Sequence, residues 1–463
     1  MNTTSPPSPR RSLFSFLKEK PPADGPYRRD DVTAFKRWQY KIMGGMMGGY
    51  ALFYIIRKNF SMAMSSLEQE AGYSNTELGF ILTCHLIVYG SGKFINGMLA
   101  DRANPRYFMM IGLGLSALIN LIFPLSQLYW VMVGLWALNG WAQSMGWPPC
   151  AKLLTSWYEP NRVTSWWGLW NASHQIGGAA ILVGGGFLIE AYGWQSVFWV
   201  PACVAFVGCL WIFSLVRDRP ESMGFASPHE RVSHEGAEHA ANPKEAVSFG
   251  QDVEVDEGLS VWEQTRRYII TNPLIWLVSL GNAFVYIVRI GMLDWSPKFL
   301  KEARGVDLTE AGALTASLEI AGILGGLAAG AIVDRYFKGR AALVISIYMF
   351  VLAFALVALY QYPVQGVSAN LIFMVVIGFL VYGPQMLTAV SAARFAPRSC
   401  AAAATGFNGL FGYLGAAISG VGTGYFVDNF GWGGGVIFYC IAASIGLILF
   451  AVAYVLSKRL YPS

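Results

Sequence analysis

The stretches "GMLADRANPR" (97–106) and "GAIVDRYFKGR" (330–340) share one pattern, Gly-x-x-x-Asp-Arg, although they lie in different halves of the chain. Each closes a long apolar segment. Their aspartates, Asp101 and Asp334, are separated by 233 positions in a chain of 463 residues. A repeat at this distance predicts that the chain is a tandem duplication of one unit, with both copies in the same orientation.

A second pair of stretches repeats with nearly the same spacing. "ALFYIIRKNF" (51–60) and "AFVYIVRIGM" (283–292) each contain an arginine three residues after a tyrosine, within an apolar run. These arginines, Arg57 and Arg289, are separated by 232 positions. Because two independent landmarks agree to within one residue, we expect the duplication to span each half of the chain.

The composition is that of a membrane protein. Hydrophobic residues make up 54% of the chain and charged residues 13%, whereas soluble globular proteins carry about 25% charged residues. A helix needs about 20 mainly apolar residues to span a bilayer. The predicted spans are 38–62, 78–100, 106–124, 129–153, 166–190, 194–215, 272–299, 309–333, 341–361, 367–390, 400–427 and 433–457. The sequence therefore predicts an all-α membrane protein with twelve transmembrane helices in two pseudo-symmetric six-helix bundles.

One long polar stretch divides the predicted spans into two groups of six. We expect a cytoplasmic N-terminal tail at 1–37, partly disordered or lying on the membrane surface, and a first six-helix bundle at 38–216. A flexible cytoplasmic linker is predicted at 217–264, because this stretch is charged and poor in large apolar residues. The second bundle is predicted at 265–457 and a short cytoplasmic tail at 458–463.

Lysine and arginine residues favour one side of the predicted bundles. They concentrate in the N-terminal tail, in the loops after the second, fourth, eighth and tenth spans, and after the twelfth span. Loops rich in positive charge remain on the cytoplasmic side of a membrane, so both termini are predicted to lie in the cytoplasm. The loop after the seventh span is an exception, with Lys301 and Arg304, but acidic residues accompany them.

The two arginines inside apolar runs need an explanation. An arginine near the centre of a membrane helix costs about 2.5–3.5 kcal/mol on insertion scales. Each would be structural if it reached the membrane surface or paired with an acid, and Asp294 is such an acid for Arg289. Pseudo-two-fold symmetry instead brings equivalent positions together at the midplane. Two guanidinium groups facing one cavity suit a phosphate dianion, because each presents a planar fork of donors to phosphate oxygens. We expect Arg57 and Arg289 to bind phosphate.

Two further basic residues lie within apolar segments. His174, in "WNASHQIGG", is either part of the same site or a neutral packing residue. Lys93 either extends to the membrane surface or adds positive charge to the cavity.

The Asp-Arg pairs of the repeated stretches are candidates for gates. Asp101 with Arg102, and Asp334 with Arg335, stand at predicted helix ends, where a carboxylate pairs in one conformation and separates in another. Their arginines also act as signals of topology.

Other chemistries lack a signature in the sequence. The six cysteines are scattered, none of them in a CxxC pair, so neither a disulfide framework nor a metal site is indicated. No GxxxxGK[ST] loop is present, and the modest net charge of +5 follows the predicted topology rather than a nucleic-acid surface. We therefore expect neither an enzyme nor a nucleic-acid-binding protein.

Several stretches closely resemble one transporter family over nearly all twelve spans. They include "GYALFYIIRKNF", "WWGLWNASHQIGG", "YIVRIGMLDWSPKFL" and "GFNGLFGYLGAAISG". These are similar to segments of the organophosphate:phosphate antiporters of the major facilitator superfamily, which include bacterial hexose-phosphate and glycerol-3-phosphate transporters. The resemblance implies exchange of an external sugar phosphate for internal inorganic phosphate across a bacterial inner membrane, by a monomer without a metal or other cofactor.

The resemblance also assigns residues to the site. It implies that Arg57, Arg289 and His174 bind the phosphate group. The residues that match the family's cavity are Tyr50, Tyr54, Tyr89, Lys93, Trp147, Asn171, Tyr286, Glu319, Tyr382 and Tyr413.

The resemblance leaves the organic part of the substrate open. Bacterial hexose-phosphate transporters carry an acid and a lysine in the eleventh helix, where this chain has the neutral residues Thr405 and Asn408. We expect Thr405, Asn408 and Asp294 to belong to the substrate-binding cavity as well. We favour a hexose phosphate, especially glucose-6-phosphate, with glycerol-3-phosphate as an alternative. Another alternative is a transporter-like sensor of external hexose phosphate that signals through a membrane histidine kinase. A third, proton symport of another organic anion, requires a titrating acid in the cavity, for which Glu319 and Asp294 are the candidates.

Overall fold

The computed structural model describes residues 31–159, 163–228, 261–337, 340–362, 366–397 and 400–460. Within these ranges the chain is almost entirely helical and contains no β-strand. Most of the predicted N-terminal tail (1–30), most of the predicted linker (229–260) and the end of the C-terminal tail (461–463) lie outside the described residues. The limits of the tails, linker and bundles therefore remain predictions.

In its described part, the first half of the chain makes six crossings. Its helices are α1 (Val32–Ala71), α2 (Asn75–Arg102), α3 (Pro105–Ile122), α4 (Tyr129–Ser144), α5 (Trp147–Trp157), α6 (Val163–Tyr192) and α7 (Ser196–Leu215), with short 3-10 turns at Phe123–Leu125 and Pro220–Met223. Helices α4 and α5 together form one crossing. It is interrupted at Met145 and Gly146, just before Pro148 and Pro149, because proline lacks the N–H that would continue the helix.

The second half also makes six crossings in its described part. Its helices are α9 (Val261–Thr265), a π-helical turn at Arg266–Ile270, α10 (Pro273–Arg304), α11 (Leu308–Arg335), α12 (Ala341–Gln361), α13 (Val367–Arg394) and α14 (Ala401–Leu460). Helix α14 contains two crossings, because Gly431 has φ 66° and breaks the helical path; this left-handed conformation is accessible to glycine. The described helices cover every predicted span, so the predicted all-α membrane fold is confirmed.

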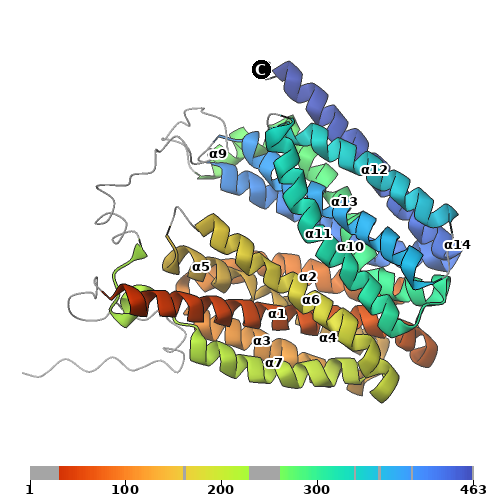
Figure 1. Ribbon diagram of the computed structural model, residues 1–463, viewed down its shortest axis with the longest axis horizontal. Helices are drawn as coiled ribbons and strands as arrows, with labels where there is room; N and C mark the ends of the chain where they lie inside the picture. Colours follow the sequence, from red (N-terminus) through yellow and green to blue (C-terminus); the bar gives the residue numbers. More distant parts are fainter. Residues whose placement is uncertain are drawn as a thin grey trace, which may run out of the picture.

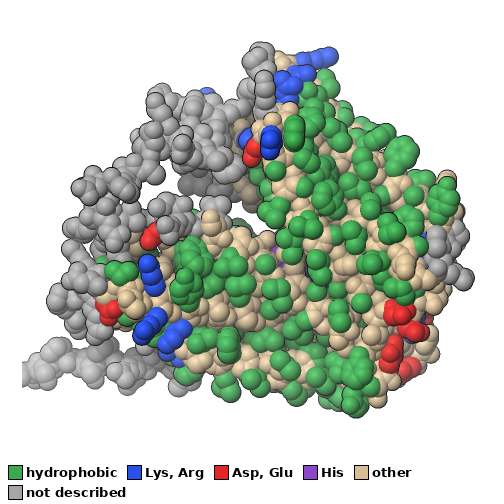
Figure 2. Space-filling view, viewed as in Figure 1, with side chains coloured by type: hydrophobic (Ala, Val, Ile, Leu, Met, Phe, Trp, Pro, Cys, Tyr) green, Lys and Arg blue, Asp and Glu red, His purple; other side chains and the backbone are tan. Residues whose placement is uncertain are grey.

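The outer surface of the helices is apolar. Nine of the described helices are long and apolar enough to cross a membrane, with α14 counted once. Large apolar side chains such as Leu210 on α7 and Ile372 on α13 are more than 60% exposed, and Figure 2 shows such side chains over both bundles. A soluble monomer rarely exposes apolar patches of this extent, so the chain is a multi-pass membrane protein.

The helices form two bundles that lie side by side (Figure 1). Helices α1 to α7 make the first bundle and α10 to α14 the second. Each has its own hydrophobic core: Ile42, Trp157 and Trp170 are fully buried in the first, whereas Val288 and Phe450 are fully buried in the second. The site lies where these bundles face each other.

The two ends of the molecule differ in charge. We call the end where α1 begins and α14 ends the tail side, and the end where α1 leads into α2 the far side. Figure 2 shows acidic side chains gathered at the far side, on the right. The basic residues Arg102 and Arg335 end α2 and α11 on the tail side. This distribution agrees with a cytoplasmic tail side, although the orientation of the termini remains a prediction.

Candidate functional site

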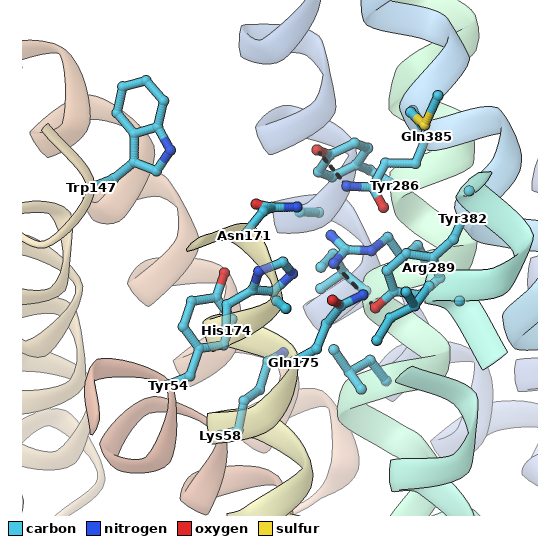
Figure 3. Close-up of a pocket in the computed structure, with 18 of the residues that line it drawn as sticks. Tyr54, Lys58, Trp147, Asn171, His174, Gln175, Tyr286, Arg289, Tyr382 and Gln385 are labelled. Carbon is cyan, nitrogen blue, oxygen red and sulfur yellow. Dashed lines mark hydrogen bonds between the residues drawn. The ribbon is translucent and has the colours of Figure 1, made fainter. Parts of the chain in front are cut away.

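A cavity of 460 Å³ lies between the two bundles. Helices α1, α2, α5 and α6 line it from the first bundle, and α10, α11, α13 and α14 from the second. Figure 2 shows the hollow between the bundles on the tail side. Figure 3 shows labelled side chains from both bundles pointing into the same space.

Arg57 and Arg289 both line this cavity, from α1 and α10. Tyrosine rings support each guanidinium. The Cζ atom of Arg57 lies 4.1 Å from the ring centre of Tyr89. The Cζ atom of Arg289 lies 4.6 Å from the ring centre of Tyr382, and its Nη2 donates a hydrogen bond of 3.2 Å to that tyrosine's hydroxyl. Within the described residues neither arginine has a carboxylate within ion-pair distance. Both positive charges are therefore available to an anion.

Most of the other predicted cavity residues join the arginines on the wall. These are Tyr50, Tyr54, Tyr89, Lys93, Trp147, Asn171, His174, Tyr286, Tyr382 and Tyr413. The imidazole of His174 lies 5.1 Å from the ring of Tyr54, centre to centre. Lys93 Nζ lies 4.4 Å from the ring centre of Trp147 and donates to the hydroxyl of Tyr413 over 3.4 Å. The structure thus brings these residues into one cavity; their roles in binding remain a proposal.

Four residues predicted for the cavity are buried or turned elsewhere. Glu319 is 3% exposed on α11 and does not line the cavity. Thr405 and Asn408 on α14 do not line the cavity either: Thr405 donates to the carbonyl oxygen of Ala401 within its own helix, and Asn408 is 2% exposed. The main-chain carbonyl of Asn408 accepts a hydrogen bond from Asn282 on α10 over 2.8 Å. The side chain of Asn408 donates to Thr388 Oγ1 on α13 over 3.5 Å, so Asn408 contacts two helices of its own bundle.

Asp294 is the fourth, and it pairs with Lys58 rather than with Arg289. Five residues advance an α-helix by about 140° beyond a full turn, so Asp294 leaves the face of α10 that carries Arg289. It points instead at α1, where Ser61 Oγ also donates to it over 3.3 Å. The alternative in which Asp294 pairs with Arg289 is therefore wrong.

The predicted gate residues end α2 and α11 on the tail side. Asp101 and Arg102 are exposed, and Lys152 Nζ donates to the carbonyl oxygen of Asp101 over 3.0 Å. Asp334 and Arg335 are exposed at the equivalent place. Their gating role remains a prediction, and Arg162, Lys338 and Arg398 of the neighbouring tail-side loops lie outside the described residues.

Sequence reasoning missed three polar residues on the cavity wall, namely Lys58, Gln175 and Gln385. Lys58 directly follows Arg57, so two adjacent positive charges in an apolar run were a usable signal. Gln385 follows Pro384 within α13, and a glutamine beside a helix-interior proline was the corresponding signal there.

Ion pairs join the two bundles at the far side of the cavity. Lys58 on α1 pairs with Asp294 on α10. One turn further, Lys298 on α10 is completely buried and contacts Glu68, Asn75 and Glu302, with 3.3 Å between its Nζ and Glu302 Oε1. A buried lysine is stabilised only when its charge is compensated, so these contacts hold only while the bundles stay together at this end.

Carboxylates from one bundle also cap helices of the other at the far side. Asp428 on α14 accepts hydrogen bonds from the backbone N–H groups of Asn75 (3.0 Å) and Thr76 (2.7 Å) at the start of α2. Glu190 on α6 accepts from the backbone N–H of Thr309 (3.2 Å) at the start of α11. The first N–H groups of a helix lack partners within it, so each carboxylate completes a helix across the interface. The site is closed at the far side and accessible from the tail side.

The cavity is suited to an anion and not to a bound metal. In the part of the chain that is described, no group of three or more His, Cys, Asp or Glu residues could hold a metal ion. The charged residues on the wall are Arg57, Lys58, Lys93 and Arg289, all of them basic.

Comparisons with known proteins agree on the family. The model of the Major Facilitator Superfamily matches residues 46–420. A probable hexose phosphate transport protein of Chlamydia pneumoniae is 36% identical, over 90% of this chain and 91% of that relative. The glycerol-3-phosphate transporter of Bacillus subtilis is also 36% identical, over 95% of this chain and 98% of its own. The membrane sensor protein UhpC of Escherichia coli is 35% identical, over 94% and 97%.

Solved structures agree with the fold. A bacterial homologue of the human lysosomal transporter Spinster, in an inward-facing and unoccupied conformation, matches with a TM-score of 0.71 at 16% identity, over 92% of this chain and 98% of that one. This likeness concerns the fold alone, whereas the family model and the sequence relatives cover most of the chain at higher identity. The chain therefore belongs to the major facilitator superfamily, within the organophosphate:inorganic phosphate antiporter family that its motifs resemble.

Proposed function

We propose that this protein exchanges an external organophosphate, in particular a hexose phosphate such as glucose-6-phosphate, for internal inorganic phosphate by alternating access. It lies in the inner membrane with its tail side in the cytoplasm. The observation that carries this proposal is the position of Arg57 and Arg289, which come from equivalent helices of the two halves and line one cavity. The hexose phosphate and glycerol-3-phosphate relatives support the same class of substrate.

Phosphate fits this site electrostatically. A pair of unit charges 4 Å apart gains about 4 kcal/mol at an effective dielectric constant near 20, and two arginines about 10 Å apart repel each other by under 2 kcal/mol. A dianion between Arg57 and Arg289 therefore gains more than the arginines lose. Because the arginines belong to different bundles, a bound phosphate also draws the bundles together at the cavity.

The same charges make the transport an exchange. Closing the empty cavity on the tail side would bury several basic side chains without a counter-ion, and uncompensated buried charge is costly. A phosphate or an organophosphate removes most of this cost. The loaded carrier therefore reorients and the empty carrier does not, so each outward step with one anion is followed by an inward step with another.

The cavity volume is compatible with a hexose phosphate. Pockets of about 300–1,000 Å³ hold small organic ligands, and 460 Å³ lies within this range. Glycerol-3-phosphate is the smaller alternative.

Counterflow in proteoliposomes tests the proposal. Vesicles loaded with inorganic phosphate would be given labelled glucose-6-phosphate, glycerol-3-phosphate or free glucose. We expect uptake of a phosphorylated compound only, and only with phosphate inside. Uptake without internal phosphate, or uptake of free glucose, would overturn the proposal.

Substitution of the arginines tests the assigned site. Arg57→Lys and Arg289→Lys should each abolish exchange, because a compact ammonium group cannot reproduce the planar fork of guanidinium donors. Arg267→Lys is the matched control, since Arg267 is exposed and does not line the cavity. Normal exchange by either cavity variant would reject the assigned site.

A sensor of external hexose phosphate is the second candidate, favoured by the 35% identity to the sensor protein UhpC. A sensor would bind glucose-6-phosphate with the same residues but transport it slowly or not at all. Calorimetric binding without counterflow would therefore support the sensor, with a histidine kinase as the expected partner.

A further inference from the structure

The cavity wall is built in two layers, one helical turn apart. Residues three or four apart share a face of an α-helix and lie about 4.5–6 Å apart along its axis. Five helices each contribute such a pair to the wall. The inner layer, nearer the far side, consists of Arg57, Tyr89, His174, Arg289 and Tyr382. The outer layer, nearer the tail side, consists of Tyr54, Lys93, Asn171, Tyr286 and Gln385.

The two layers differ in chemistry. The inner layer holds both arginines, whereas the outer layer holds two amides, two phenols and one lysine. If phosphate binds at the inner layer, the group esterified to it extends into the outer layer, because the cavity opens in that direction. The outer layer therefore selects among organophosphates, and inorganic phosphate does not reach it.

Within the outer layer, Gln385 has a side-chain amide whose hydrogen-bonding capacity is not fully satisfied within the part of the chain that the structure describes. Its Nε2 donates to the hydroxyl of Tyr286 over 3.5 Å, which is the outer limit of a hydrogen bond. Its Oε1 is buried and has no partner among the described residues. An unpaired buried polar atom costs about 1–3 kcal/mol. Whichever way the amide is turned, one of its two polar atoms lacks a protein partner.

The Gln385 amide lies at the junction of the two layers. Figure 3 shows the Gln385 side chain reaching into the cavity between Tyr286 and Arg289, with Asn171 directed toward the same space from α6. Nε of Arg289 is likewise buried without a partner in the described part of the chain. Gln385 lies three residues after Tyr382, whose hydroxyl accepts a hydrogen bond from Arg289. A ligand that reaches both layers meets the arginine and the amide together.

We propose that Gln385, oriented by Tyr286, is a specificity-determining residue that accepts a hydrogen bond from a hydroxyl group of the substrate's organic part. This inference rests on the proposed function of the cavity and narrows it to organophosphates with a neutral, hydroxyl-bearing group. The wall carries no carboxylate among the described residues, so an amine has no counter-ion there. A hydroxyl, in contrast, satisfies an amide oxygen without bringing a charge.

The test compares substrates that differ by one hydroxyl group. Purified protein in proteoliposomes would exchange labelled inorganic phosphate, with glucose-6-phosphate or its 2-, 3- and 4-deoxy analogues as competitors. For the native protein, at least one deoxy analogue should need about a tenfold higher concentration than glucose-6-phosphate for half-inhibition, the effect of losing one good hydrogen bond. In Gln385→Leu this ratio should fall to about threefold or less, because the acceptor is gone for both competitors.

The ratio compares the half-inhibitory concentrations of two competitors on the same variant, so a lower overall exchange rate does not affect it. If Gln385→Leu fails to insert into the membrane, Gln385→Met, which keeps an unbranched side chain, allows the same measurement. Ile372→Val on the same helix is the control, because Ile372 is 65% exposed on the outer surface. It should keep the native ratio.

Two outcomes would overturn the inference while leaving the proposed function intact. One is a native protein that treats all deoxy analogues like glucose-6-phosphate. The other is a Gln385 variant that keeps the native ratio for each of them, in which case Oε1 is satisfied by water or another residue. Absence of any competition by organophosphates in the native protein would instead reject the proposed function itself.

Discussion

Asp428 on α14 caps the first turn of α2 in the other bundle through Thr76, whose backbone N–H and hydroxyl both donate to Oδ2, over 2.7 and 2.6 Å. Glu190 on α6 does the same for Thr309 at the start of α11, with hydrogen bonds of 3.2 and 3.0 Å. Thr76 and Thr309 are 233 positions apart, the spacing of Asp101 and Asp334. The far-side closure is therefore duplicated along with the fold.

The close contacts beside these caps follow the same symmetry. A Cβ atom on Gly79 of α2 would collide with the carbonyl oxygen of Gly420 on α14, and one on Gly312 of α11 would collide with that of Leu182 on α6. Gly79 and Gly312 are also 233 positions apart. Each bundle thus presents one capped, glycine-bearing helix start to the other, and both contacts must break for the far side to open.

Asp428→Ala should shift the protein toward a state that is open at the far side. Loss of a helix cap costs about 1 kcal/mol, which changes the ratio of closed to open states about fivefold. Spin labels on Leu128 and Tyr360, two exposed residues of different bundles at this end, report the change by double electron–electron resonance as a larger share of long distances. Asn429→Ala is the matched control, since Asn429 donates only within its own helix. An unchanged distance distribution in Asp428→Ala would contradict the capping role.

Glu190→Ala should act in the same direction on the symmetric contact, by a similar amount. The two caps belong to different helix pairs, and distant independent sites contribute additively. The double variant Asp428→Ala/Glu190→Ala should therefore shift the ratio of states by roughly the product of the single shifts in the same spin-label measurement. If the double variant behaved like one single variant, the two contacts would not be independent halves of one closure.

Gly79→Leu should prevent closure of the far side, whereas Gly97→Leu on the same helix should not. A side chain at position 79 meets the backbone of α14, which cannot move aside without separating the bundles, and a side chain at position 97 meets nothing within 4 Å. Phosphate exchange in proteoliposomes should be lost in Gly79→Leu and retained in Gly97→Leu. Retained exchange in Gly79→Leu would mean that this contact is not needed in the transport cycle.

Hydropathy predicted the spans but not where the helices end. The first span was predicted at 38–62, whereas α1 runs from Val32 to Ala71. Hydropathy locates only the part of a helix that lies in hydrocarbon, and α1 continues into the polar region until Asp31 caps its start and Gly72 ends it in a left-handed conformation. The sequence places the break near Gly431 correctly, because the polar residues Asp428 and Asn429 separate two apolar runs there.

Internal repetition predicted the arginines on the cavity wall, because equivalent positions of a duplication meet at its axis. It could not predict the partner of Lys58, which lies 236 residues away on α10. Such a pairing depends on how far each helix is rotated about its own axis, and an apolar run with few polar residues leaves that rotation open. The same limit explains why Thr405 and Asn408, which we expect on the cavity wall from the sequence, do not line it.

Removal of one partner from the Lys58–Asp294 pair should destabilise the protein more than removal of both. Both residues are at most 7% exposed in their side chains, and breaking a buried ion pair leaves an uncompensated charge that costs about 3–5 kcal/mol. We expect Lys58→Met and Asp294→Asn each to lower the thermal unfolding temperature in detergent, and the double variant to recover most of the loss. Lys41→Met, at an exposed lysine of the same helix, should have little effect. A double variant as unstable as the sum of the single variants would show that the two charges do not compensate each other.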